Sequence, residues 1–276
     1  MSCADASREA GVALPGTATR AERWLLVEHP GRWGRDPVDD TPLPADVTEA
    51  LGRFDGRVLL LRRPGRPGSG TTVFRADTAE EGGRLRRLDL TTIDALPGAE
   101  REAGEDVSGP LVLVCAHGRR DPCCARLGPP TYEALLAHLD PACVWQSSHH
   151  GGHRFAANVL VLPWGVQLGR VGVEDAAGVA SALGAGRIPL EHYRGRTLYE
   201  PPVQAAEVAV RRAHGLDAVD AVHLVACDDA GHVCFLGPDG ELRAIVEERE
   251  GPAVPASCGD EPAPTTSFAV RVESST

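Results

Sequence analysis

Short apolar runs that end near glycine or proline constrain this chain most, because each suits a buried strand and is too short for a buried helix. Residues 24–29 read WLLVEH before Pro30-Gly31, residues 57–62 read RVLLLR, and residues 111–114 read LVLV. Residues 45–54 lie between the first two runs and have helical spacing. Buried strands that alternate with helices are typical of α/β proteins, so we expect an α/β fold.

Two units of the chain have a similar order of expected elements. The first has strand, helix, three strands and a short helix, at residues 24–29, 45–54, 57–62, 71–76, 84–90 and 91–96. The second has strand, loop, helix, strand, turn, a two-stranded hairpin and a closing helix, at residues 111–114, 115–128, 129–139, 144–147, 149–155, 158–162 with 166–171, and 174–183. The second order is that of a thioredoxin fold.

The polar, glycine-containing residues 98–109 suit a linker between these units. After residue 200, we expect a helix at 204–214, a small antiparallel meander within 222–246, and an irregular, proline-rich segment at 251–266. The predicted organisation is therefore a flexible N-terminus at 1–20, an N-terminal α/β domain at 21–105, a thioredoxin-like domain at 106–199 and a small α+β C-terminal extension at 200–276.

Charge and hydropathy restrict the partners of this chain. The net charge is −11, which argues against nucleic acid as a partner. Residues 200–276 carry a net charge of −9, which suits either a solvated acidic face or a docking surface for a basic redox protein. No stretch reaches the roughly 20 apolar residues of a membrane helix, and residues 1–11 do not resemble a secretory signal. We therefore expect no membrane contact and a cytoplasmic location.

The chain has eight cysteines, which in a cytoplasmic protein are not expected to form a disulfide framework. Four of them lie in one histidine-rich region, at Cys115, Cys123, Cys124 and Cys143. The other four are scattered, at Cys3, Cys227, Cys234 and Cys258, and we expect these to be small buried hydrophobic residues.

Two loops carry candidate metal ligands. Cys115 ends a buried strand and Cys124 follows nine positions later. His149 and His153 share a face if their glycine-containing turn is helical. In a thioredoxin order both loops open at the same end of the sheet, so two thiolates and two imidazoles can converge. Spacing alone leaves an iron–sulfur cluster, a zinc ion and no metal open, although zinc fingers place their cysteines closer together.

The stretches CAHGRRDPCCARLG and SSHHGGHRFAANVLVLPWGVQLGRV closely resemble the sucrase/ferredoxin-like family, as do residues 24–36 and 202–211. That resemblance implies a thioredoxin-like ferredoxin domain with a [2Fe–2S] cluster, which two cysteines and two histidines bind. By position these are Cys115, Cys124, His149 and His153. Cys124 is favoured over Cys123 because alanine follows it and glycine lies four positions later. The word sucrase in the family name finds no support in this sequence, because no carboxylate pair is set out for glycoside hydrolysis.

The resemblance implies an electron carrier that catalyses no reaction alone and needs a redox partner, because no flavin or nicotinamide motif is visible. Two rivals stay open: a thioredoxin-type thiol enzyme with Cys123 or Cys124 as nucleophile, and a zinc-stabilised interaction module. We expect His117 and His150 not to be ligands and Cys143 to lie in the core. Four arginines surround the candidate site, and we expect them to be solvated loop charges or to steer an acidic partner. They are Arg119, Arg120, Arg126 and Arg154.

Overall fold

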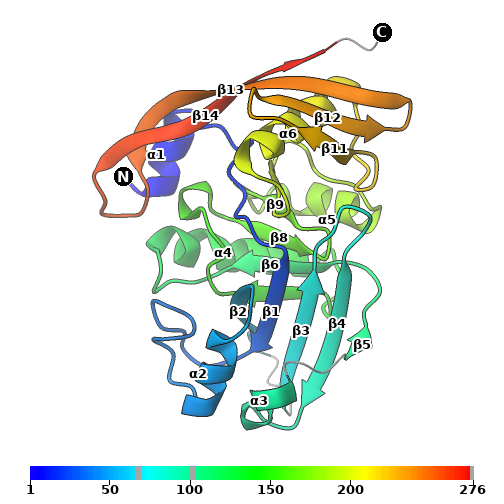
Figure 1. The fold of residues 1–276 in the computed structure, drawn as a ribbon. Coiled ribbons are helices and arrows are strands. Elements are labelled where there is room, and N and C mark those ends of the chain that lie inside the picture. Colours follow the sequence, from blue (N-terminus) through cyan, green and yellow to red (C-terminus); the bar gives the residue numbers. More distant parts are fainter. Residues whose placement is uncertain (66–69, 100–103, 274–276) are drawn as a thin grey trace.

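The computed structural model describes residues 1–65, 70–99 and 104–273. It is a mixed α/β structure with one ten-stranded sheet and a separate four-stranded sheet (Figure 1), which confirms the expected α/β class, while the thioredoxin-like domain stays a prediction. The helices are α1 (Cys3–Glu9), α2 (Ala45–Gly52), α3 (Leu96–Ala99), α4 (Pro122–Leu136), α5 (Ala176–Gly184) and α6 (Pro201–His214), with 3₁₀ turns η1 (Ile93–Ala95) and η2 (His153–Phe155).

The ten-stranded sheet has the order β10-β9-β8-β6-β7-β2-β1-β3-β4-β5. Its strands are β1 (Arg23–Glu28), β2 (Arg57–Arg62), β3 (Thr71–Asp77), β4 (Arg84–Leu90), β5 (Glu105–Asp106), β6 (Leu111–Cys115), β7 (Val144–Ser147), β8 (Val159–Leu162), β9 (Val166–Leu168) and β10 (Tyr193–Arg196). The short apolar runs of the sequence form its central strands.

The two halves of this sheet repeat one arrangement. In the first half β1 pairs in parallel with β2 and antiparallel with β3, which pairs antiparallel with β4. In the second half β6 pairs in the same way with β7 and β8, and β8 with β9. An antiparallel pair joins the halves, with Leu61 of β2 opposite Ser147 of β7. The two units therefore share one sheet, and a domain boundary near residue 105 stays a prediction.

A hydrophobic core common to both units holds the halves together. The rings of Phe74 on β3 and Trp145 on β7 meet edge to face, with 5.6 Å between their centroids. Two strands lie between them, so a flat sheet with about 4.8 Å between strands would hold β3 and β7 about 14 Å apart. The sheet is therefore strongly coiled, and the two halves pack against each other.

The other faces of the halves are covered by helices. Tyr132 and Leu135 of α4 and Leu183 of α5 pack on the strands of the second half. Val47 and Leu51 of α2 pack on the first half. This layering places the N-terminus of α4 beside the end of β6.

Two segments differ from expectation. The N-terminal residues 1–20, for which we expect flexibility, contain α1, and Cys3 and Ser7 of this helix are buried. The guanidinium of Arg170 donates hydrogen bonds to the Ser7 and Val12 carbonyls at 3.1 and 2.7 Å, which fixes the segment against the second unit. Such long-range contacts leave no local signal in the sequence.

The proline-rich segment 251–266 was expected to be irregular and instead belongs to a long hairpin of β13 (Gly240–Pro255) and β14 (Pro262–Val272). The prolines are tolerated because Pro255 and Pro262 lie opposite each other where the hairpin pairing ends. Residues 105–106 of the expected linker form β5, and residues 100–103 of that linker lie outside the described residues.

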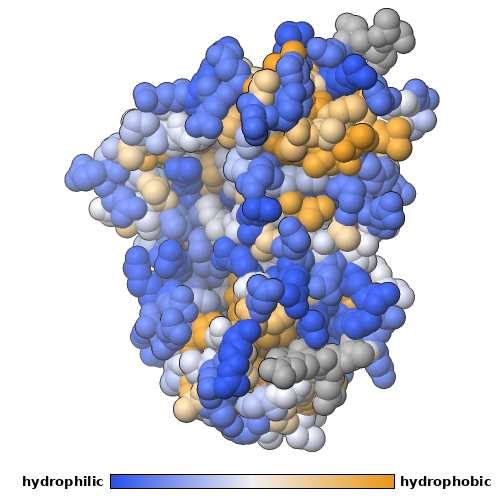
Figure 2. All heavy atoms as spheres, viewed as in Figure 1, coloured by the Kyte–Doolittle hydropathy of each residue, from blue (hydrophilic) through white to orange (hydrophobic). Residues whose placement is uncertain are grey.

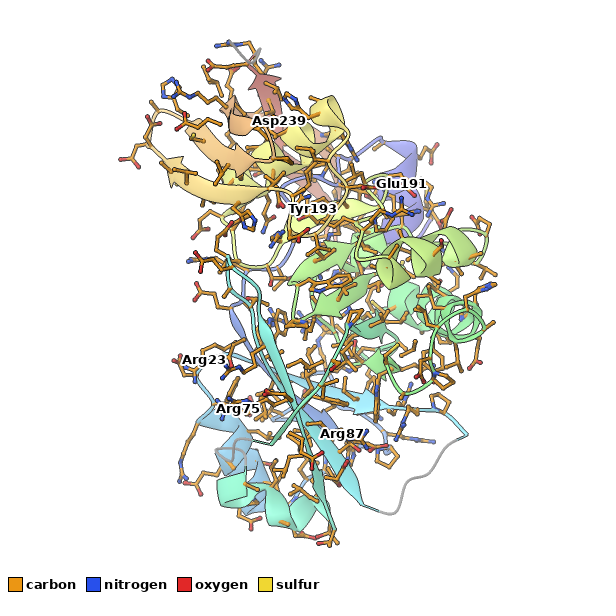
Figure 3. All side chains as sticks on the ribbon, turned by 90° about the vertical axis from the view of Figure 1, so that its right-hand side faces the viewer. Arg23, Arg75, Arg87, Glu191, Tyr193 and Asp239 are labelled. Atoms are coloured by element: carbon orange, nitrogen blue, oxygen red, sulfur yellow. The ribbon has the colours of Figure 1, made fainter. Side chains whose placement is uncertain are left out.

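The C-terminal sheet has the order β11-β12-β13-β14, with β11 (His223–Cys227) and β12 (His232–Gly237), and α6 packs on it. Glu207 of α6 is fully buried and accepts hydrogen bonds from Arg196, Arg211 and the Tyr193 hydroxyl. Tyr193 lies where the ten-stranded sheet meets the C-terminal sheet (Figure 3). Hydrophobic side chains gather on the surface over this sheet (Figure 2), where Val225 and Leu236 are exposed. No helix within the described part of the chain could cross a membrane.

Candidate metal centre

The candidate ligands lie at the carboxyl ends of two central strands of the ten-stranded sheet. Cys115 is the last residue of β6, and His149 follows the last residue of β7 by two positions. Since β6 and β7 are parallel, with Cys115 opposite Ser147, their carboxyl ends lie side by side. Both elements are buried, so the sheet fixes the start of both loops.

Cys124 lies in the first turn of α4, which begins at Pro122. The expected loop therefore ends seven residues earlier than predicted, and Pro129 and Pro130 lie inside the helix. The Asp121 side chain caps α4 by accepting a hydrogen bond from the Cys123 N–H at 2.7 Å, and Pro122 suits the first helical position. This Asp-Pro signal was present in the sequence and could have placed the helix start.

Three of the four predicted ligands come together. The Cys115 and Cys124 sulfurs lie 3.6 and 3.8 Å from Nδ1 of His149, and these three atoms are all within 4.8 Å of one another. Both cysteines are buried, while His149 is half-buried. Two sulfurs and a ring nitrogen at this spacing can share one metal centre.

His153 lies beside this group. Its ring centroid is 5.0 Å from that of His149, with 30° between the ring planes. Its Nδ1 is buried and has no hydrogen-bond partner among the described residues. Burial lowers the pKa of His153, and the Ala256 carbonyl opposes this effect. A buried imidazole nitrogen without a partner suits a ligand position, although His153 lies outside the tight group of three.

The turn between the two histidines is not helical. Gly151 and Gly152 have φ values of 103° and 75°, and η2 starts only at His153. A Cβ on Gly152 would lie 2.3 Å from Nη2 of Arg194, and one on Gly151 would lie 1.8 Å from the Thr19 hydroxyl. The glycines are therefore needed for the close approach of these side chains. His149 and His153 face each other across a non-helical glycine turn, and not along one face of a helix as we expected.

Arg194 holds this turn, and sequence reasoning missed it. Its buried guanidinium donates to the Gly151 carbonyl at 3.2 Å and to the Asn158 side-chain oxygen at 2.8 Å. The Asn158 amide in turn donates to the Gly152 carbonyl at 2.8 Å. Nothing in the sequence around Arg194 indicates this role, because the contact joins residues about 40 positions apart.

His117 positions His149 from the other side. Its Nε2 donates to the Gly34 carbonyl at 2.6 Å, and its Nδ1 accepts the His149 N–H at 3.2 Å. His150 is fully buried, accepts a hydrogen bond from Gln167, and has its pKa lowered by burial to about 3. Neither imidazole belongs to the group of donor atoms.

The electrostatic surroundings shift the pKa values of the two sulfurs in opposite directions. A hydrogen bond from Cys124 lowers the pKa of Cys115 well below its usual value, against the effect of burial, and His149 lowers it further. The same hydrogen bond, together with burial, raises the pKa of Cys124. The Cys115 sulfur is therefore the one of the pair whose pKa is lowered, and a bound cation would lower the pKa of both thiols.

Four other side chains named in the sequence analysis lie near the candidate centre or pack on the second unit. Cys143 is half-buried against the core of the second unit. Arg126 pairs with Asp5 of α1 at 2.8 Å, and Arg154 stacks on the Phe155 ring. Arg119 is exposed and lines a small hollow with His117.

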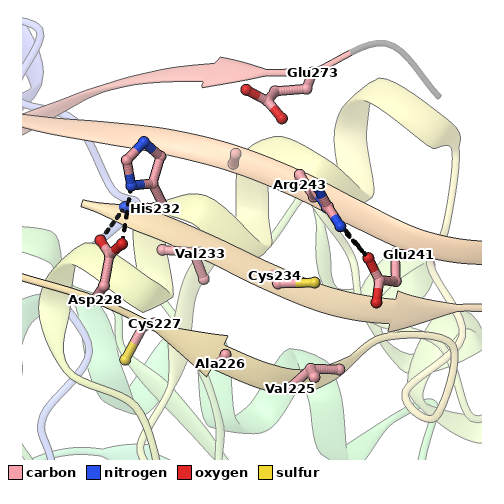
Figure 4. Close-up of a pocket in the computed structure, with 11 residues that line it drawn as sticks. Val225, Ala226, Cys227, Asp228, His232, Val233, Cys234, Glu241, Arg243 and Glu273 are labelled. Carbon is pink, nitrogen blue, oxygen red and sulfur yellow. Dashed lines mark hydrogen bonds and ion pairs between the residues drawn. The ribbon is translucent and has the colours of Figure 1, made fainter. Parts of the chain in front are cut away.

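Another pocket, of about 400 Å³, lies on the outer face of the C-terminal sheet (Figure 4). His232 pairs with Asp228 there, and Arg243 pairs with Glu241. Cys227 is exposed and Cys234 half-buried in this pocket, so neither is the buried residue that we expected. None of the four predicted ligands lines it.

An α/β chain with two cysteines and a histidine grouped at the carboxyl ends of two central strands has a candidate Cys/His metal centre. The chain belongs to the sucrase/ferredoxin-like family, whose model matches residues 14–195.

Two relatives are yeast proteins named altered inheritance of mitochondria protein 32. The protein of Meyerozyma guilliermondii is 35% identical over 104 residues, which are 33% of this chain and 36% of the relative. The protein of Clavispora lusitaniae is 40% identical over 97 residues, which are 32% of this chain and 35% of the relative. The matches thus span about a third of these curated relatives. No solved structure matches this chain.

Proposed function

We propose that this protein binds a [2Fe–2S] cluster through Cys115, Cys124, His149 and His153 and carries single electrons. The observation that carries the proposal is the approach of two buried sulfurs to Nδ1 of His149, beside the buried, unpartnered Nδ1 of His153. Two sulfurs and two imidazole nitrogens are a known donor set for such clusters. When bound, the cluster supplies one-electron redox chemistry.

The chain's own residues prepare this site. Arg194 and Asn158 fix the glycine turn, and His117 orients the His149 backbone. Cys124 lies in the first turn of α4, where the positive end of the helix dipole stabilises negative charge. These contacts hold the donors in place without a large rearrangement on binding.

A thiol enzyme with Cys123 or Cys124 as nucleophile is less well supported. Both sulfurs belong to buried residues, with exposed fractions of 1% and 0%. A catalytic thiol must be reached by its substrate, so reactive cysteines are partly exposed. A redox protein remains the proposed partner, with the acidic residues 200–276 as a candidate docking surface, and a cytoplasmic location stays a prediction.

Metal and sulfide analysis of protein purified without oxygen tests the proposal. We expect two irons and two acid-labile sulfides per chain, with visible absorbance. Cys124→Ser should abolish or strongly perturb the cluster, while the neighbouring Cys123→Ser should leave it nearly intact. Stoichiometric zinc at this site with no visible absorbance would reject the cluster. The reverse order of the two variants would show that the cysteine assignment is wrong by one residue.

A further inference from the structure

Three cysteines from distant parts of the chain meet beside the candidate metal centre. Cys3 belongs to α1, Cys123 to the first turn of α4, and Cys258 to the turn between β13 and β14. The sulfur of Cys123 lies 3.5 Å from that of Cys3 and 3.4 Å from that of Cys258, and the third side of the triangle is 3.6 Å. The sequence offered no reason to group them.

A buried carboxylate completes the group. The Asp121 oxygens lie 3.7 and 3.8 Å from the Cys3 sulfur, and all four donor atoms are within 4.8 Å of one another. Asp121 is fully buried. Among the described residues no arginine or histidine forms an ion pair with it. His153 is near enough for its charge to lower the pKa of Asp121 but does not pair with it. A buried carboxylate that faces three sulfurs and has no ion-pair partner is suited to bind a cation.

The same carboxylate is held firmly in place. It accepts hydrogen bonds from the Cys123 N–H at 2.7 Å, the Cys258 N–H at 2.9 Å and the Ser257 hydroxyl at 2.8 Å. Oriented carboxylates with such outer hydrogen bonds are typical of metal ligands. The backbone of two of the three cysteine-bearing segments is thereby positioned by Asp121.

We propose that Cys3, Cys123, Cys258 and Asp121 bind a structural zinc ion. Tetrahedral zinc with Zn–S bonds of about 2.3 Å separates its sulfurs by about 3.8 Å, close to the triangle found here. A disulfide needs an S–S bond of about 2.0 Å, much shorter than these separations. Binding is not a redox step: Zn²⁺ replaces the protons of three thiols, which pass to solvent, and the carboxylate supplies the fourth ligand.

The zinc site is independent of the proposed cluster. The two donor groups have no residue in common, although Cys123 and Cys124 are adjacent. Neighbouring side chains on a helix diverge by about 100°, so each cysteine serves a different site. With four protein ligands the site is closed, which is typical of structural zinc. The bound zinc ion would join α1 and the β13–β14 turn to the start of α4.

Metal analysis of the full chain by mass spectrometry tests this proposal. After growth with added zinc, we expect one zinc per chain. Cys258→Ser, in a half-buried turn, should lose that zinc while iron, sulfide and visible absorbance stay unchanged. Cys234→Ser is the matched control, because this half-buried cysteine belongs to neither group, and it should retain the zinc. Cys124→Ser should also retain one zinc, whatever happens to the iron.

Cobalt(II) offers a measurement that needs no variant. Protein loaded with cobalt in place of zinc should show thiolate-to-cobalt charge-transfer absorbance in proportion to the zinc displaced. Wild-type protein without zinc, Cys258→Ser protein with undiminished zinc, or a disulfide among Cys3, Cys123 and Cys258 would each overturn the proposal. If wild-type protein holds two zincs and no iron, and Cys258→Ser holds one, the cluster proposal fails while the zinc site stands.

Discussion

Replacing Gly128 with alanine should disturb the candidate centre by steric overlap. Gly128 lies in α4 where the helix passes the end of β6. A Cβ at this position would lie 2.0 Å from the Cys115 carbonyl oxygen and 3.1 Å from the Ala116 Cα. Ordinary contacts begin at 3.4 Å, so α4 or the end of β6 must move by about 1.4 Å. The obstacle is backbone, and no side-chain rotation relieves it.

Two opposing effects determine how much Gly128→Ala changes the free energy of unfolding. Overpacking a tight interior costs about 1–3 kcal/mol, and we expect the upper end because backbone must move. Alanine in place of glycine within a helix returns about 1 kcal/mol. The free energy of unfolding should therefore fall by about 1–2 kcal/mol. Cys124 lies one helical turn before Gly128, so the same shift should separate its sulfur from Cys115 and lower the bound iron per chain.

Urea denaturation and iron analysis measure both effects. Gly178→Ala is the matched control, because Gly178 lies in α5 with no atom within 4 Å of the added Cβ. That variant should be more stable by up to about 1 kcal/mol and retain its iron. If Gly128→Ala is as stable as Gly178→Ala and binds as much iron, α4 does not pass the centre as closely as described.

Two further predictions concern buried charge and ligand identity. Glu207→Gln should lower the free energy of unfolding by about 3–5 kcal/mol in urea denaturation, because it leaves Arg196 and Arg211 buried without their carboxylate. The control Glu247→Gln, at an exposed ion pair, should lower it by less than about 1 kcal/mol. Equal decreases in the two variants would show that burial of the Glu207 ion pairs does not matter. His149→Cys should lower the midpoint potential in a redox titration followed by visible absorbance, because a thiolate replaces a neutral imidazole. Exchange of both histidines spans from about −150 to +300 mV with two histidines to about −400 mV with four cysteines, so the single exchange should cover part of that span. An unchanged potential with the cluster intact would show that His149 is not a ligand, and the exposed His138→Cys serves as control.

Local patterns predicted most of the strands and helices. The apolar runs at 24–29, 57–62 and 111–114 form β1, β2 and β6, because a short buried run between turn residues leaves few other conformations. The Pro129-Pro130 pair predicts a first helical turn, which places the start of α4 seven residues too late. The N-cap at Asp121 outweighed that signal.

The sequence by itself determined the repeated strand order and the loops that carry Cys115, Cys124, His149 and His153, since strand ends and residue spacing depend on near neighbours. Only the tertiary structure decided that both units share one coiled sheet, that Arg194 supports the glycine turn, and that Cys3 and Cys258 reach Cys123. The cysteine contacts join residues 120 to 255 positions apart. Their formation depends on how α1 and the β13–β14 hairpin pack on the second unit, and no local pattern encodes such packing.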